Sequence, residues 1–301
     1  MRIATENAVV FAAIVTNLML SGCISGQLGA ARHRSSDQSL ACRADSAGVD
    51  FRYGRPSKVL DGTGWVFGIP RKLLLWDRRV DNHAVGDDTA EWIAEYAETQ
   101  ELDGLCVRVN QYDPVGEFGR LRTNQTVAPG WRYTFGTMTV IGYTLLPGRI
   151  FGGDQYNPFT NSVYIHSDVP ALAVEATAYA QDVQSRSWPG TYAAVNELPF
   201  VSIWHETVNV KDAADFVEQH GTEKQRADGL RVLHSNYGST VAFAVGAGPI
   251  EQIGAAVAGQ FTGAFHASRL DSPATEEAVA DPPSVDESRV RLASASTSTD
   301  R

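Results

Sequence analysis

The sequence predicts an α+β fold, with a small sheet near the N-terminus followed by a mostly helical C-terminal half. Short segments rich in Val, Ile, Thr and Tyr precede residue 170, whereas longer segments with helical periodicity follow it. The flanking segments 23–48 and 271–301 are polar, which confines the folded part to 49–270. An order of strands first and helices after is typical of an α+β domain rather than of repeated βαβ units.

The first part of this domain is expected to begin the sheet. Residues 65–76 are apolar around Pro70 and predict a strand and a turn. Residues 88–100 predict a helix, because Asp88 stands at a capping position and the apolar side chains fall on one face. Residues 105–112 alternate Val with Arg and Asn, which is typical of a half-buried strand.

The middle of the domain is expected to complete the sheet before the helices begin. Residues 131–146 are rich in Thr, Tyr, Val and Ile and predict a strand or a hairpin. Residues 148–158, with Gly, Asp and Asn, predict a loop, and 162–166 a short strand. Helical patterns then occupy 170–185, 192–221 (as one or two helices) and 222–234.

A glycine-rich segment ends the domain. Between residues 235 and 265 Glu251 is the only formally charged residue, and Gly259 and Gly263 have the GxxxG spacing that lets helices approach closely. We expect a helical hairpin over 235–267. It is either a tightly packed pair in the core of a soluble domain or a membrane-apposed element that drives oligomerisation.

Composition excludes some function classes. The 301 residues carry 25 Lys and Arg against 35 Asp and Glu, a net charge of −10, which argues against non-specific nucleic-acid binding. The chain has no P-loop, no Gly-x-Ser-x-Gly elbow and no pair of histidines within one helical turn. With three cysteines it is no disulfide scaffold. Cys42 and Cys106 would either pair in an oxidising periplasm or remain two thiols.

The N-terminal residues predict where in the cell the protein is located. Residues 1–22 have the basic start and short apolar run of a secretory signal peptide. The run ends in Leu20-Ser21-Gly22-Cys23, which resembles the lipobox of bacterial lipoproteins and implies that the Cys23 thiol carries a diacylglycerol. Ile24 stands where Asp would favour the inner membrane, so we expect a periplasm-facing protein anchored at the outer membrane. A plain signal peptide or an uncleaved anchor is the alternative.

These assignments divide the chain. Residues 1–22 are the signal peptide, 23–48 a lipidated tether and 49–270 the folded domain. Residues 271–301 are rich in Ser, Thr, Ala, Pro and acids, and we expect a disordered tail there because such a composition cannot bury enough apolar surface.

The middle of the chain resembles a family of bacterial envelope proteins related to gluzincin zinc metallopeptidases. The segment 146–161, followed by Ser-Val-Tyr-Ile-His-Ser-Asp over 162–168, carries the resemblance, which extends over about 65–267. In those relatives a Ser-Asp-x-Pro-Ala turn, here residues 167–171, leads into a helix bearing His-Glu-x-x-His. The resemblance implies a minimal-zincin-like fold over 49–270.

The residues needed for zinc depart from that pattern. The two histidine positions are Val174 and Ala178, which cannot bind metal, whereas Glu175 matches the motif glutamate. Glu206 stands about where the resemblance implies the third ligand, a glutamate on the next long helix. The domain is therefore expected to be a pseudoenzyme with two vestigial glutamates. Simple exposed helix carboxylates are the alternative for Glu175 and Glu206.

Three functions remain open at this point. The first is a non-catalytic lipoprotein that binds or scaffolds a protein or peptide at the cell envelope, without a cofactor. The second is a metal-dependent hydrolase with rearranged ligands, in which zinc would be held by at least three of His166, Glu175, His205, Glu206 and His234. The third is a membrane-apposed oligomerisation protein that uses the glycine-rich hairpin.

Overall fold

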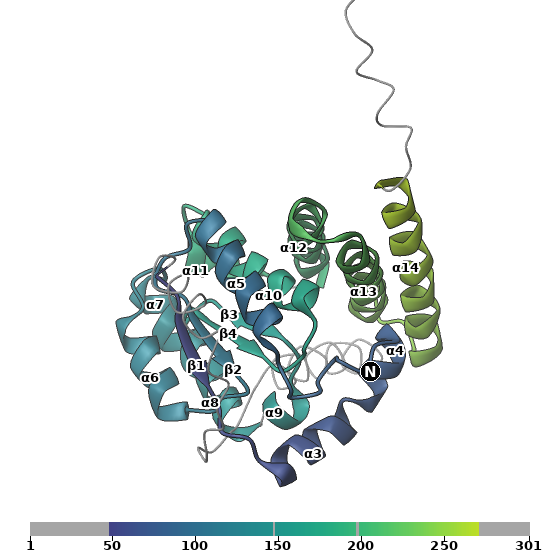
Figure 1. Ribbon diagram of the computed structural model, residues 1–301. Coiled ribbons are helices and arrows are strands. Elements are labelled where there is room, and N and C mark those ends of the chain that lie inside the picture. Colours follow the sequence, from purple (N-terminus) through teal and green to yellow (C-terminus); the bar gives the residue numbers. More distant parts are fainter. Residues whose placement is uncertain (1–47, 147, 197–198, 271–301) are drawn as a thin grey trace, which may run out of the picture.

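A small sheet lies at the centre of the first half of the chain, and helices enclose it (Figure 1). The computed structural model describes residues 48–146, 148–196 and 199–270. The expected signal peptide, Cys23, Cys42, nearly all of the tether and the tail 271–301 lie outside the described residues. The four strands have the order β1-β2-β4-β3 and comprise β1 (Asp50–Tyr53), β2 (Cys106–Val109), β3 (Gln155–Asn157) and β4 (Ser162–Ile165).

The mixed α+β class is confirmed, but the sheet differs from the expected order of strands before helices. Strands β1, β2 and β4 are parallel, and β3 pairs with β4 as an antiparallel edge. Parallel neighbours need long crossovers, which here contain helices. The first crossover holds α3 (Lys58–Phe67), α4 (Ile69–Leu75) and α5 (Asp87–Thr99). The second holds α6 (Pro114–Thr123), α7 (Pro129–Trp131), the π-helical turn η1 (Arg132–Gly136), α8 (Thr137–Leu145) and α9 (Gly148–Phe151), followed by β3.

Two segments expected to be strands are helical. Residues 65–76 form the end of α3 and the whole of α4, where Pro70 occupies the first turn and therefore removes no helical hydrogen bond. Residues 131–146 form a continuous helix through η1 and α8. The threonine hydroxyls of this helix donate hydrogen bonds to backbone carbonyls of the preceding turn. The Thr144 hydroxyl, for example, donates to the Val140 carbonyl at 2.7 Å. Tertiary context thus overrides strand propensity.

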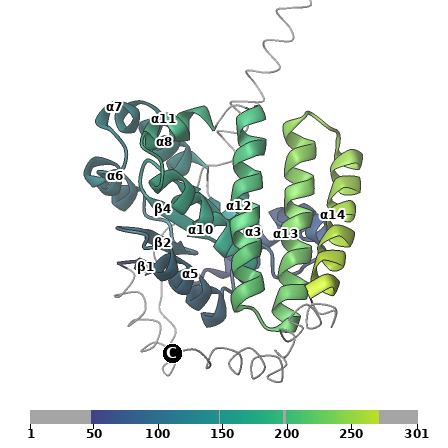
Figure 2. The same ribbon diagram turned by 90° about the horizontal axis from the view of Figure 1, so that it is seen from above.

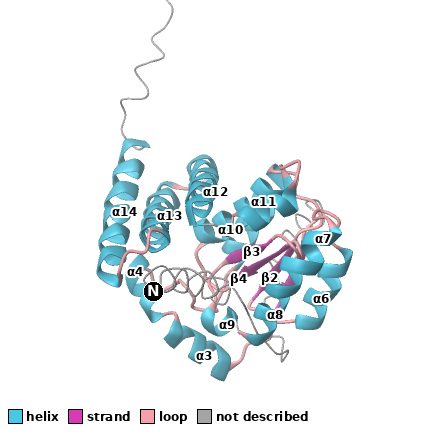
Figure 3. Ribbon diagram, turned by 180° about the vertical axis from the view of Figure 1, so that it is seen from behind, coloured by secondary structure: helices cyan, strands magenta, loops and turns pink. Residues whose placement is uncertain are grey.

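Strands β2 and β4 are buried on both faces, and Figure 3 shows helices on either side of the sheet, whereas the edge strand β1 is mostly exposed. Val107 and Val163 are paired across β2 and β4 and belong to the main core, which α5 and α10 (Pro170–Gln184) complete. Arg108 and Tyr164 are paired on the other face, toward α6 and α8. The strand expected over 105–112 forms over Cys106–Val109, but it is fully buried and not half-buried, because polar partners buried with Arg108 cover its polar face.

The second half is helical, as expected. After α10 come α11 (Pro189–Val195), α12 (Pro199–His220), α13 (Glu223–Ala244) and α14 (Pro249–Leu270). Helices α12, α13 and α14 lie side by side, with α10 between α12 and the sheet (Figure 2). The segment 148–158, expected to be a loop, contains α9 and β3.

The glycine-rich segment forms the expected hairpin from the second half of α13 and the whole of α14. Its glycines allow close backbone contact within the chain. A Cβ atom at Gly259 would lie 2.1 Å from the His234 carbonyl oxygen, and one at Gly263 would lie 2.4 Å from that of Leu230. The GxxxG spacing is therefore used in packing α14 against α13. Among the residues described, no helix combines the length and apolar character of a membrane span.

Candidate functional site

A cavity of about 310 Å³ lies where α10, α12 and α13 meet the edge of the sheet at β3. Each helix presents one face to it, with residues three and four positions apart. On the sheet side, the segment 154–159 closes the cavity, together with Arg71 of α4. The helical lining consists of Leu172, Glu175, Ala176 and Tyr179 on α10, Ser202, His205, Glu206 and Asn209 on α12, and Asn236, Thr240, Phe243 and Ala244 on α13.

The two glutamates singled out by the resemblance meet in this cavity. Glu175, only 7% exposed, shares a side-chain hydrogen bond with Glu206. Asn236 Nδ2 lies 3.0 Å from Glu175 Oε1 and 3.2 Å from Oε2, and Thr240 forms a hydrogen bond with Glu206. The alternative of simple exposed helix carboxylates does not describe these side chains.

Burial and mutual repulsion set the protonation of this pair. Burial raises the pKa of Glu175 well above its usual value, and the negative charge of Glu206 raises it further. Burial also raises the pKa of Glu206, but His205 and the hydrogen bond from Glu175 oppose that rise. Two carboxyl groups in contact cannot easily both ionise, so the pair holds one proton between them, mainly on Glu175.

The two degenerate motif positions do not face the cavity. Val174 and Ala178 are both 0% exposed and belong to the main apolar core. Glu175 and Tyr179, one turn apart, belong to the four residues that α10 presents to the cavity.

His205 also lines the cavity, but its ring is held by neighbours. Its Nε2 lies 2.9 Å from Asn209 Nδ2, and its Nδ1 lies 3.0 Å from Asp182 Oδ2. Asp182 also binds Tyr192 and Arg186 through very short contacts. The surrounding donors keep the pKa of Asp182 below its usual value, against the opposing effect of burial. Sequence reasoning missed Asp182, although it lies seven residues after Glu175 on α10.

The other two candidate histidines lie elsewhere. His166 shares the Asn110 Oδ1 acceptor with His83, each at 3.2 Å, and burial lowers the pKa of His166 to about 3. His234 Nε2 lies 3.3 Å from His266 Nδ1 in the contact between α13 and α14. Within the described ranges, no group of three or more His, Cys, Asp or Glu side chains is placed to hold a metal ion.

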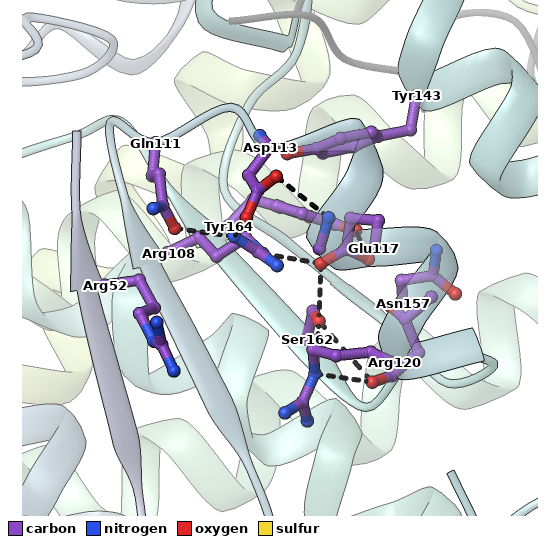
Figure 4. Close-up of polar contacts among 12 residues, drawn as sticks. Arg52, Arg108, Gln111, Asp113, Glu117, Arg120, Tyr143, Asn157, Ser162 and Tyr164 are labelled. Carbon is purple, nitrogen blue, oxygen red and sulfur yellow. Dashed lines mark hydrogen bonds and ion pairs between the residues drawn. The ribbon is translucent and has the colours of Figure 1, made fainter. Parts of the chain in front are cut away.

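A second polar cluster occupies the opposite face of the sheet (Figure 4). Arg108 Nε lies 2.5 Å from Glu117 Oε1, and the two residues are 3% and 0% exposed. Glu117 also accepts hydrogen bonds from Ser162 Oγ at 2.9 Å and from Tyr164 Oη at 2.7 Å. Gln111 accepts from Arg108 Nη1 at 2.6 Å. All these groups are satisfied among themselves, so we assign the cluster a structural role.

One cysteine of the pair considered from the sequence lies within the described residues. Cys106 is a buried free thiol on β2, and burial raises its pKa. Its expected alternative partner, Cys42, lies outside the described residues, so the pairing stays a prediction. A buried thiol with a raised pKa is poorly reactive.

Comparison with family models, with curated proteins and with solved structures gives no match to this chain.

Proposed function

We propose that this protein is a lipoprotein of the bacterial envelope, anchored through Cys23, whose domain binds a protein or peptide ligand in the cavity without hydrolysing it. The observation that carries the proposal is the contact of the buried Glu175 with the half-buried Glu206 in a cavity of about 310 Å³. Binding sites are concave and combine apolar walls with a few converging polar groups. Here the tyrosine, phenylalanine and aliphatic walls surround two carboxyl groups and several amides.

The resemblance to metallopeptidases supports a binding role because the catalytic ligands have been replaced. Val174 and Ala178 stand at the histidine positions and pack into the core, and Glu206 bonds to Glu175. Of the five candidate ligands of a rearranged zinc site, His166 and His234 are engaged by Asn110 and His266, and Glu175, His205 and Glu206 line the cavity without forming a metal-holding group of the described side chains. The hydrolase with rearranged ligands therefore gains no support from the described side chains.

Metal content tests the non-catalytic part of this proposal. The full chain is purified from membranes, and its zinc is measured by elemental analysis beside that of Glu206→Gln. We expect zinc well below one equivalent in both proteins. Stoichiometric zinc that is lost in Glu206→Gln would refute the binding role and favour the hydrolase.

Membrane fractionation tests the anchor. Cys23→Ala should move the protein from the membrane to the soluble fraction, since it removes the expected lipid. Cys106→Ala is the matched control and should stay with the membrane, because that thiol is buried in the domain. A Cys23→Ala protein that remains membrane-bound would refute lipid anchoring.

A further inference from the structure

Buried acceptors without donors line the cavity beside the glutamate pair. Asn209 is 3% exposed, and while its Nδ2 binds His205, its Oδ1 has no hydrogen-bond partner within the described part of the chain. Asp154 Oδ1 accepts from the backbone N–H groups of His166 and Ser167, but its Oδ2 is equally unpartnered there. A buried acceptor left without a donor costs free energy, so both atoms point to a ligand that brings donors.

These acceptors belong to the same site as the carboxyl pair. Glu206 and Asn209 are three residues apart on α12 and therefore neighbours on one face of the helix, and both line the cavity. The cavity lining thus offers two carboxyl groups and an amide oxygen. These three acceptors equal in number the three N–H donors of a primary ammonium group.

The charges around the cavity favour a cation. Its charged lining consists of Arg71 against Asp154, Glu175 and Glu206, and His205 is engaged by Asp182. Arg71 is itself paired with a further carboxylate, because its Nη1 lies 3.2 Å from Asp81 Oδ1. The site therefore has more carboxyl groups than cationic side chains to balance them. The pair of Glu175 and Glu206 shares a proton where a cationic partner would otherwise stand.

We infer, on the basis of the binding function proposed above, that the cavity recognises a primary ammonium group, which donates to Glu175, Glu206 and Asn209 Oδ1. The ammonium group replaces the proton that the two carboxyl groups share, and that proton passes to solvent. Tyr156 and Tyr179, whose ring centroids are 5.3 Å apart, line the cavity and would contact the alkyl stem of the group. A lysine side chain and the N-terminus of a peptide both supply this chemistry.

Three tripeptide probes separate these sources. Acetyl-Ala-Lys-Ala-amide carries only a lysine ammonium, Ala-Ala-Ala-amide only an N-terminal ammonium, and acetyl-Ala-Ala-Ala-amide neither. Binding to the full chain is measured by ligand-observed NMR titration. We expect at least one ammonium probe to bind about tenfold or more tightly than the neutral probe, as a charged hydrogen bond provides. The probe that gains this affinity identifies the source.

Isosteric variants locate the binding. Glu206→Gln and Glu175→Gln should each weaken the ammonium probe by about tenfold or more and leave the neutral probe unchanged. Glu98→Gln, at an exposed position of α5, is the matched control and should change neither. Thermal unfolding of each variant checks that it is folded. Affinity for the lysine probe, whose ammonium group keeps its charge well above neutral pH, should also rise with pH, because binding requires release of the shared proton.

The failures are distinguishable. If the neutral probe binds as tightly as both ammonium probes, the cavity binds ligands but the inference of an ammonium site is wrong. If none of the three binds, both the inference and the peptide-binding function are refuted. Zinc that binds more tightly than either ammonium probe and loses affinity in Glu206→Gln would replace the ammonium site with a metal site.

Discussion

The buried ion pair of Arg108 and Glu117 offers a sharp test of how this fold is held together. The change Glu117→Gln removes a negative charge while keeping the shape of the side chain. It leaves the Arg108 guanidinium, 3% exposed, without its closest anion, since Asp113 Oδ2 stands 3.8 Å from it at the surface end of the cluster. It also changes the acceptor that binds the hydroxyls of Ser162 and Tyr164.

The size of the effect follows from the burial of the charge that remains. Breaking a buried ion pair by removing one partner costs about 3–5 kcal/mol, because the other charge stays desolvated. For a domain of this size, one kcal/mol lowers the melting temperature by roughly 2–4 °C, so we expect a fall of roughly 6–20 °C. An exposed ion pair such as Lys211 with Asp215 should contribute far less, because solvent screens both charges.

Urea unfolding monitored by circular dichroism measures this loss. Glu98→Gln, an exposed change of the same chemistry, serves as the control and should lie within about 0.5 kcal/mol of the parent. The double variant Arg108→Met, Glu117→Leu removes both charges and should recover more than half of the stability lost by Glu117→Gln alone. A loss below about 1 kcal/mol in Glu117→Gln, or a double variant no more stable than Glu117→Gln, would refute the reasoning.

Three further outcomes are expected. Gly259→Ala should lower the free energy of unfolding by about 1–3 kcal/mol because its Cβ meets a backbone oxygen at 2.1 Å, whereas Gly254→Ala, with open space around its Cβ, should raise it by about 0.5–1 kcal/mol in the same urea assay. Because the pKa of Glu175 is raised in the folded state, stability falls as pH rises above about 4.3, and Glu175→Gln should flatten that fall in unfolding curves measured across pH. His166, whose pKa is lowered to about 3, should stay neutral in imidazole NMR spectra of the folded protein at pH 5, and its contribution to stability should decline as pH falls from 6.5 toward that value.

The helical half of the fold could be predicted because its signals are local. The helix over 170–185 begins with a proline in its first turn, and Thr222 with Gln225 forms a capping box at the start of α13. Such features depend only on residues within a few positions of each other. The hairpin was predictable for the same reason, since closely spaced glycines favour close helix packing.

The sheet half was harder because its residues respond to partners far away in sequence. Residues 131–146 have the composition of a strand, yet they form a helix in which Tyr143 packs on Tyr164 of β4, with ring centroids 5.1 Å apart. Arg108 looks like a solvent-facing strand residue until Glu117, nine positions later, is brought beneath it by α6. Neither partner can be identified from local propensity.

The candidate site shows where transfer of a motif between sequences reaches its limit. The metallopeptidase pattern pointed to Glu175 and Glu206, and these two residues lie on two helices and meet in one cavity. The motif match could not predict how α10 is rotated about its axis. A shift of one residue in the match turns the assigned side chain by about 100° around the helix. That rotation is fixed by packing, because Val174 and Ala178 fit the apolar core and so direct Glu175 and Tyr179 into the cavity. The same rotation brings Glu175 against Glu206, and the acceptor-rich site that we propose for an ammonium group is its consequence.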